Sequence, residues 1–303
     1  MRILFNPIVM EHPGNAQEGP SRMEGFNDVE VTEVDKEAAQ KAINDLYNNN
    51  KLNIRKVMGM CKSKSRIAES QLSKGTLDAI IASVSLSLKA ADSQDFAIAR
   101  PPGHHANLYV PKGFCIINNI AVVVHKLVTQ GHKVCIIDID GHHGNGTQDI
   151  FIKNPNVLYC SLHQENSYPN TGGLKDKAVG EETVNYPIPP GSGDDIFEVV
   201  TERILKRTQE FSPDIIAVSA GFDGHKDDPL LDLNFTDHSY YFFGKSLANL
   251  NIPTFSVLEG GYHNKLRNCV DSFISGFNGE KYNFQDEKTD SPQLISAIIN
   301  KFI

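Results

Sequence analysis

The stretch 138–146 concentrates side chains that could do chemistry. It holds two carboxylates, two imidazoles and three glycines, and it directly follows the apolar run 134–137, which predicts a buried strand. Asp140 and His142 lie two positions apart, so in an extended backbone their side chains point to the same side. A carboxylate and an imidazole that converge from one face are two of the three protein ligands that a catalytic zinc ion requires.

A second predicted strand, 215–219, leads to a candidate third ligand, Asp223. Parallel strands end at the same edge of a sheet, which would bring Asp223 to Asp140 and His142. Two carboxylates and one imidazole make an oxygen-rich ligand set, so Fe(II) or Co(II) could replace Zn(II). The structural alternative for Asp223 is a turn or a helix N-cap. His225 is a competing ligand, although a histidine in a loop is more often solvated.

Two further predicted strands also end in reactive residues. His104 and His105 follow the strand 96–99 and a Pro-Pro-Gly turn. Because imidazole titrates near neutral pH, they either add metal ligands or act as general acid and base. Tyr262 follows the strand 254–258 and a Gly-Gly turn, where its hydroxyl can hydrogen-bond a developing oxyanion. Each motif alone could be an ordinary loop, but their shared place at strand ends favours one active site.

Short apolar runs alternate with helical patterns along the chain. This order predicts an α/β fold with a mostly parallel central sheet and helices on both faces. No linker, repeat or change of composition divides the 303 residues, so we expect one domain over 1–303. Strands are predicted at 3–5, 96–99, 134–139, 157–162, 215–219 and 254–258. Helices are predicted at 36–47, 77–91, 116–129, 195–210, 238–250 and 265–277.

The composition excludes several classes of protein. The net charge of −8 argues against nucleic-acid binding and suits a cationic substrate. No apolar segment is long enough to cross a bilayer, and the N-terminal apolar run is too short for a signal peptide. The five cysteines are odd in number and form no C-x-x-C motif, which indicates a reducing compartment, and we expect the cytoplasm. The composition does not predict an oligomeric state.

Together these motifs resemble the zinc-dependent histone deacetylase superfamily, which includes the acetylpolyamine amidohydrolases. The class II and prokaryotic branch is the more similar one, because of the run His-His-Gly-Asn-Gly-Thr-Gln at 142–148. The resemblance implies an arginase-like three-layer fold. The matching stretches, in the family's order, are 100–106, 113–115, 138–148, 161–163, 221–223, 228–230 and 259–262.

The resemblance also implies roles for the reactive residues. His105 would be the main general base and acid, oriented by Asn145, and His104 would be oriented by Asp138. Tyr262 would polarise the acyl oxygen of the substrate. Zn²⁺ would be bound by Asp140, His142 and Asp223.

A substrate channel and a second ion follow from the same resemblance. Gly113, Phe114 and Tyr168 would form the channel walls around an alkyl stem. Leu230 matches the position at the channel mouth of lysine deacetylases, where polyamine-selective relatives are expected to have an acidic residue. A structural K⁺ would be bound by oxygen atoms of Asp138, Asp140, His142, Ser161 and Leu162.

Three departures from the family pattern carry expectations of their own. Gly141 stands where relatives usually have a larger side chain, so we expect a looser loop between two metal ligands. Asn145 replaces the second aspartate of class I enzymes, so we expect a lower pKa for His105 than an aspartate would give. The short segment between Gln71 and Asp78 shows no counterpart of the acidic rim residue that grips a peptide backbone.

The leading hypothesis is a metal-dependent amide hydrolase that removes the acetyl group from the terminal amine of acetyl-lysine. The alternative is an amidohydrolase for acetylpolyamines or other small acetylated amines. The partner would be an acetylated amine, on a protein or on a small molecule. A hypothesis of another class is an inactive acyl-lysine binding module, which the complete set of reactive residues disfavours. A ureohydrolase would require two metal ions and more aspartates.

Overall fold

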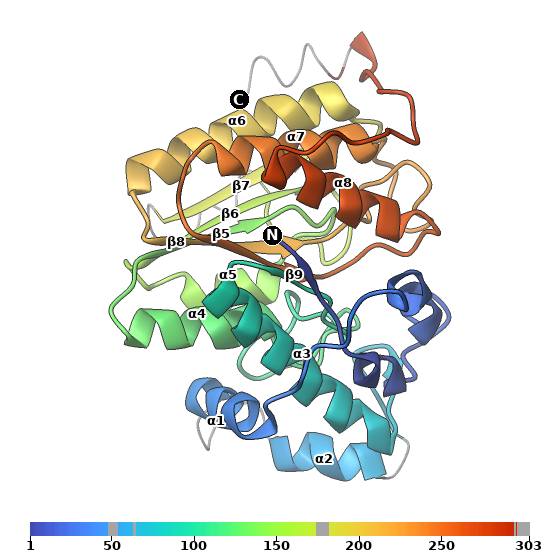
Figure 1. The fold of residues 1–303 in the computed structure, drawn as a ribbon, viewed down its shortest axis with the longest axis vertical. Coiled ribbons are helices and arrows are strands. Elements are labelled where there is room, and N and C mark those ends of the chain that lie inside the picture. The colour runs from blue at the N-terminus through green and yellow to red at the C-terminus, as the bar shows by residue number, and fades with distance from the viewer. Residues whose placement is uncertain (48–53, 63–64, 174–181, 294, 296–303) are drawn as a thin grey trace.

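A seven-stranded parallel sheet forms the middle layer of the structure, a computed structural model that describes residues 1–47, 54–62, 65–173, 182–293 and 295 (Figure 1). The strand order is β1-β4-β9-β8-β5-β6-β7. Central strands are buried on both faces, as expected for a parallel sheet covered by helices. The strands are β1 (Ile3–Leu4), β4 (Phe96–Ala97), β5 (Val134–Asp138), β6 (Val157–Gln164), β7 (Thr183–Ile188), β8 (Ile215–Ala220) and β9 (Thr254–Leu258).

Helices cover both faces of this sheet, which gives the three layers visible in Figure 1. On one face lie α1 (Lys36–Tyr47), α3 (Lys74–Ser93) and α4 (Asn119–Thr129), and on the other lie α6 (Asp194–Phe211), α7 (Asp237–Ala248) and α8 (Leu266–Asn278). The predicted α/β class is therefore confirmed. None of the described helices combines the length and apolar character needed to span a membrane. The smaller elements are α2 (Ile54–Lys62), α5 (Asn145–Phe151), the 3-10 helices η1 (Pro7–Glu11) and η2 (Pro20–Phe26), and the hairpin β2 (Arg66–Ile67) and β3 (Ser70–Gln71).

All six predicted strands and all six predicted helices are present, but the sequence patterns missed β7, α2, α5 and the β2–β3 hairpin. The strand β7 lies at the edge of the sheet and contains Pro187, which a central strand would not tolerate. The helix α5 begins inside the Gly-Asn-Gly motif, where glycine hides a helical pattern. The predicted single domain covers residues 1–303. Of these, residues 48–53, 63–64, 174–181, 294 and 296–303 lie outside the described residues.

The N-terminal segment is tied to the turn that carries the tandem histidines. Arg100 is completely buried, and its Nε atom lies 2.7 Å from Oε1 of Glu18. Its Nη1 atom donates hydrogen bonds to the carbonyl oxygens of Val9 and His12, at 3.0 and 2.6 Å. A buried charge needs such partners, so η1 and the loop that follows it support the turn after β4.

Gly244→Ala should destabilise the contact between α7 and α8. An added Cβ would lie 2.1 Å from the carbonyl oxygen of Phe273 and 2.9 Å from the amide nitrogen of Phe277, both of them backbone atoms. Overpacking of this kind costs about 1–3 kcal/mol, measurable as a lower urea midpoint. Gly59→Ala in α2 is the matched control, because its Cβ would have no heavy atom within 4 Å. Equal urea midpoints for Gly244→Ala and the wild type would contradict the packing.

Candidate active site

The ends of β5 and β8 bring three potential metal ligands together. These strands are neighbours in the sheet, and Asp138 is in register with Ser219, so the loops that follow them start side by side. The Nδ1 atom of His142 lies 2.7 Å from Oδ2 of Asp223 and 3.5 Å from Oδ1 of Asp140. All three residues are buried, and their potential ligand atoms lie within 4.8 Å of one another.

The donor set fits a divalent ion. The amide of Gly260 donates to Oδ2 of Asp140 at 2.8 Å, and the amide of Gly141 donates to Oδ1 of Asp223 at 2.6 Å. These bonds leave the other oxygen of each carboxylate directed toward Nδ1 of His142. Bonds of about 2.0–2.2 Å to one tetrahedral ion place ligand atoms about 3.3–3.6 Å apart. The 3.5 Å between Nδ1 of His142 and Oδ1 of Asp140 has this spacing, whereas the 2.7 Å to Oδ2 of Asp223 is a hydrogen-bond distance.

The electrostatics of this group call for positive charge. Burial raises the pKa of Asp223, and repulsion from Asp140 adds to that effect. Burial alone would lower the pKa of His142, but the carboxylates of Asp223 and Asp140 raise it to about 10. Two buried carboxylates that attract a proton to the imidazole between them would also attract a metal cation.

The tandem histidines lie beside this group, with their ring centroids 4.0 Å apart. The Nδ1 atom of His104 contacts Oδ2 of Asp138 at 3.1 Å, and Nδ1 of His105 contacts Oδ1 of Asn145 at 3.0 Å. An amide oxygen accepts only, so Nδ1 of His105 carries the proton and Nε2 is left as the acceptor. The structure therefore pairs each histidine with the partner expected from the sequence.

The surroundings of the two imidazoles shift their pKa values in opposite directions. Burial works against a charge on His104, yet the carboxylates of Asp140 and Asp138 raise its pKa well above the usual range. Burial and the neighbouring His104 hold the pKa of His105 well below the usual range. A lowered pKa favours the neutral form of His105, and only a neutral imidazole can accept a proton as the expected base.

A cavity of about 270 Å³ opens over the two groups. The Phe114 and Tyr262 rings meet edge to face at a centroid distance of 5.7 Å, and the His105 and Tyr168 rings meet similarly at 5.1 Å. All four predicted channel residues thus lie at the cavity that His105 and Tyr262 face. The lining residues are Glu69, His105, Gly113, Phe114, His142, Tyr168, Leu230 and Tyr262.

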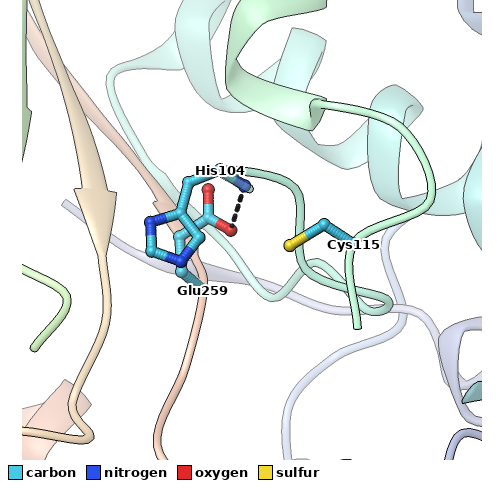
Figure 2. A group of neighbouring side chains, drawn as sticks. All are labelled: His104, Cys115 and Glu259. Atoms are coloured by element: carbon cyan, nitrogen blue, oxygen red, sulfur yellow. Dashed lines mark hydrogen bonds between the residues drawn. The ribbon is translucent and has the colours of Figure 1, made fainter. Parts of the chain in front are cut away.

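Glu259 supports the tandem histidines in a way that its motif did not indicate. Its Oε2 atom accepts hydrogen bonds from the amides of Gly103 and His104, at 2.7 and 3.1 Å, and Oε1 accepts one from Ser219. Figure 2 shows this carboxylate beneath His104, with Cys115 close by. These three side chains could form a ligand group by distance, but their hydrogen bonds make Glu259 a support for the histidine turn.

Arg22, in the N-terminal segment, holds the loop that carries Tyr262. Its Nε atom donates to the carbonyl of Gly261 at 2.7 Å, and Nη2 donates to the carbonyl of Glu259 at 2.9 Å. The guanidinium also lies 4.7 Å from the centre of the Tyr262 ring. No local pattern links positions more than 230 residues apart, so only the folded chain reveals this contact.

The expectation that Gly141 loosens its loop is wrong. A Cβ at this position would lie 2.3 Å from Cδ1 of Leu231 and 3.1 Å from Oδ1 of Asp223. The glycine instead allows close packing, and its amide donates to the Asp223 carboxylate. The structure therefore shows a tight contact between the two loops that carry the potential ligands.

His225 and the rim also differ from expectation. His225 is buried rather than solvated, and its Nε2 atom contacts Asp286 at 3.1 Å, so it belongs to a separate group with Asp227 and Asp286. An acidic residue does stand at the cavity. Glu69 lines it from the β2–β3 hairpin, where Oε2 accepts a hydrogen bond from the Gly113 amide at 3.0 Å. Glu69 lies in the tight turn of this hairpin, before the segment between Gln71 and Asp78 in which the sequence showed no counterpart of an acidic rim residue.

The predicted K⁺ site stays a prediction. Asp138 and Ser161 are in register on β5 and β6, which places both near the turn after β5. The Ser161 hydroxyl contacts Nδ1 of His163 at 2.9 Å, and Asp138 accepts a hydrogen bond from the Tyr159 hydroxyl at 3.0 Å. The carbonyl oxygens of Asp140, His142 and Leu162 would supply the remaining ligands.

Comparison with known proteins identifies the class. The family model described as the histone deacetylase domain matches residues 27–277, so this chain belongs to that deacetylase family. A solved structure of acetylpolyamine aminohydrolase from Burkholderia pseudomallei has a TM-score of 0.81 at 28% identity, covering 92% of this chain and 98% of that one. The predicted family and its arginase-like fold are therefore confirmed.

The individual relatives bear two kinds of name. Over 179 residues the chain is 46% identical to Histone deacetylase 14, chloroplastic, of Arabidopsis thaliana, covering 55% of this chain and 42% of that protein. Over 219 residues it is 35% identical to Acetylpolyamine amidohydrolase 1 of Pseudomonas aeruginosa, covering 68% of this chain and 63% of that protein. This chain thus spans about half the length of the first curated relatives it matches.

Adding Zn²⁺ should raise the melting temperature of the wild-type protein and not that of Asp223→Asn. Binding to the folded state alone stabilises it by about 2.7 kcal/mol when the ion is at 100 times its Kd. Asp227→Asn is the control, because Asp227 belongs to the separate group around His225. If Zn²⁺ raised the melting temperature of Asp223→Asn as much as that of the wild type, but did not raise that of Asp227→Asn, the ion would bind the group around His225 instead.

Proposed function

We propose that this chain is a zinc-dependent deacetylase that removes the acetyl group from the terminal amine of acetyl-lysine. The observation that carries the proposal is the single cavity onto which His105, His142 and Tyr262 open between aromatic walls. A candidate base, a candidate metal ligand and a candidate oxyanion donor thus share one narrow site. That combination suits hydrolysis of an amide at the end of a flexible stem.

The metal would be held by Asp140, His142 and Asp223. When bound there, a zinc ion lowers the pKa of water to about 7 and polarises a carbonyl oxygen. Fe²⁺ or Co²⁺ would suit the same oxygen-rich set. A structural K⁺ near Asp138 and Ser161 would neutralise further buried negative charge.

His105 and Tyr262 would carry out the proton and charge chemistry. The Nε2 atom of His105 accepts a proton from the attacking water and returns one to the leaving amine. Burial holds the pKa of Tyr262 well above its usual range, so the hydroxyl keeps its proton. It donates a hydrogen bond to the acyl oxygen as negative charge develops there. Loss of one such donor typically lowers the rate by about 10²–10³-fold.

The channel residues would position the substrate. Phe114 and Tyr168 offer flat apolar surfaces for the methylene stem of a lysine side chain. Leu230 is partly exposed at the mouth and carries no charge, which favours a substrate without a cation at that point.

Glu69 favours a second candidate, an acetylpolyamine or other small acetylated amine. Its carboxylate lines the same cavity and could pair with a free ammonium group of a polyamine. The amidohydrolase names among the relatives agree with this candidate. Leu230 and Glu69 therefore point to different substrate classes, which one experiment can separate. An inactive acyl-lysine binding module is the remaining alternative, and any metal-dependent hydrolysis excludes it.

We place the enzyme in a reducing compartment, the cytoplasm. All five cysteines are free and buried: Cys61, Cys115, Cys135, Cys160 and Cys269. Thiols of this kind persist where glutathione and thioredoxin keep them reduced.

A hydrolysis panel tests the function directly. We expect turnover of a fluorogenic acetyl-lysine peptide that stops after complete chelation and returns with Zn²⁺. The panel also contains acetylputrescine, acetylspermidine and longer acyl-lysines. Activity that survives complete metal removal would contradict the metal-dependent mechanism. Turnover of acetylpolyamines alone would make them, and not acetyl-lysine, the favoured substrate class.

Glu69→Gln separates the substrate classes within that panel. The amide oxygen of glutamine can still accept the hydrogen bond from Gly113, so only the charge is lost. Turnover of acetylspermidine should fall while that of the acetyl-lysine peptide changes little, if Glu69 recognises an ammonium group.

Asn145→Asp should move the acid limb of the kcat/KM profile to higher pH. A carboxylate stabilises an imidazolium better than an amide does, so the pKa of His105 rises. A base must be neutral to accept a proton, and the variant therefore needs a higher pH to reach full activity. A pH profile unchanged by the substitution would show that Asn145 does not set the protonation of His105.

A further inference from the structure

One carboxylate joins the loop of Tyr262 to the channel mouth. The Oδ2 atom of Asp228 accepts a hydrogen bond from the backbone amide of Tyr262 at 2.7 Å. Its Oδ1 atom accepts one from the amide of Leu230 at 3.0 Å. Asp228 itself is buried, with 6% of its surface exposed, and its own amide donates to the carbonyl of His225 at 2.8 Å.

The two hydrogen bonds that Asp228 accepts differ in how far apart their residues are in the sequence. The bond to Leu230 spans two residues and is the common turn made by an aspartate side chain. The bond to Tyr262 spans 34 residues and connects the loop after β8 to the loop after β9. The local turn at Asp228 does not need the hydrogen bond to Tyr262. The role of this second bond is therefore to hold the loop that carries Tyr262.

Tyr262 depends on support from outside its own loop. It follows Gly260 and Gly261, and Gly261 has a φ of 119°, so this segment has no regular element to fix the tyrosine. A carboxylate that accepts from a backbone amide forms a short and strong hydrogen bond. A displacement of about 1 Å at a reacting group can cost about 10²-fold in rate.

We propose that Asp228 is a positioning residue. Its Oδ2 atom fixes the position of the Tyr262 hydroxyl by holding the Tyr262 amide, and its Oδ1 atom fixes the position of Leu230 by holding the Leu230 amide. The inference rests on the proposed function, since it concerns the step in which Tyr262 meets the acyl oxygen. The carboxylate would act on kcat through Tyr262 and on KM through Leu230.

The substitution Asp228→Asn tests the link. An asparagine keeps the shape but has one acceptor for two amides, and the nearby Leu230 amide retains it more easily. We expect kcat for the acetyl-lysine peptide to fall by about 10–100-fold. In a Tyr262→Phe background the same substitution should lower kcat by less than about twofold, because the group that it positions is gone. An equal factor in both backgrounds would overturn the proposal.

A ratio of two substrates keeps the test valid if the variant folds poorly. Trifluoroacetyl-lysine stabilises the developing negative charge itself and needs the Tyr262 hydroxyl less than acetyl-lysine does. The ratio of kcat/KM for the two substrates does not depend on the amount of folded enzyme. It should shift toward trifluoroacetyl-lysine in both Asp228→Asn and Tyr262→Phe.

Asp227→Asn is the matched control. Asp227 precedes Asp228 and pairs with Lys265 at 2.8 Å, so its loss disturbs the same loop without touching the Tyr262 amide. Its substrate ratio should equal that of the wild type. A shift in Tyr262→Phe without one in Asp228→Asn would overturn the positioning role alone. A wild-type enzyme that hydrolyses no acetylated amine in the presence of metal would overturn the proposed function and this inference with it.

Discussion

The burial of two carboxylates at adjacent strand ends is the constraint on which the rest of the site depends. Asp140 and Asp223 are almost completely removed from solvent and face the same imidazole. Such charges require backbone donors, close packing and a nearby cation. Glycines supply backbone donors and allow the close packing. A Cβ would obstruct that packing, because at Gly260 it would lie 2.5 Å from Oδ2 of Asp223 and at Gly221 it would lie 2.0 Å from Oδ2 of Asp140. The same cradle that accommodates the carboxylates fits a metal ion.

Around this centre the supports come from distant parts of the chain. Glu259 holds the backbone of the histidine turn. Arg22, near the N-terminal end of the sequence, holds the loop that carries Tyr262. Arg100 and Glu18 in turn fix the N-terminal segment that carries Arg22. The N-terminal segment that precedes the matched family domain at residues 27–277 therefore supports the loop that carries the candidate oxyanion donor.

The substrate question is a matter of charge at the cavity mouth. Leu230 offers an apolar edge and Glu69 an anionic one, and the relatives bear both deacetylase and amidohydrolase names. The chemistry at the base of the cavity is common to both classes. Specificity would then depend on a few residues at the rim, where one added or lost hydrogen bond changes discrimination strongly.

The sequence by itself determined the fold class, the family and the grouping of Asp140, His142, Asp223 and the tandem histidines, because apolar periodicity locates strands and chemistry gathers at their carboxyl ends. Only the tertiary structure decided the roles of Glu69, Glu259, Arg22 and Asp228 as partners of that group. Their contacts join segments up to 239 residues apart. Such contacts depend on strand order and on the course of loops, and no local pattern encodes either. Gly141 shows the same limit: the larger side chain usual in relatives suggested that a glycine loosens the loop, whereas the approach of Leu231 from another segment makes it tight.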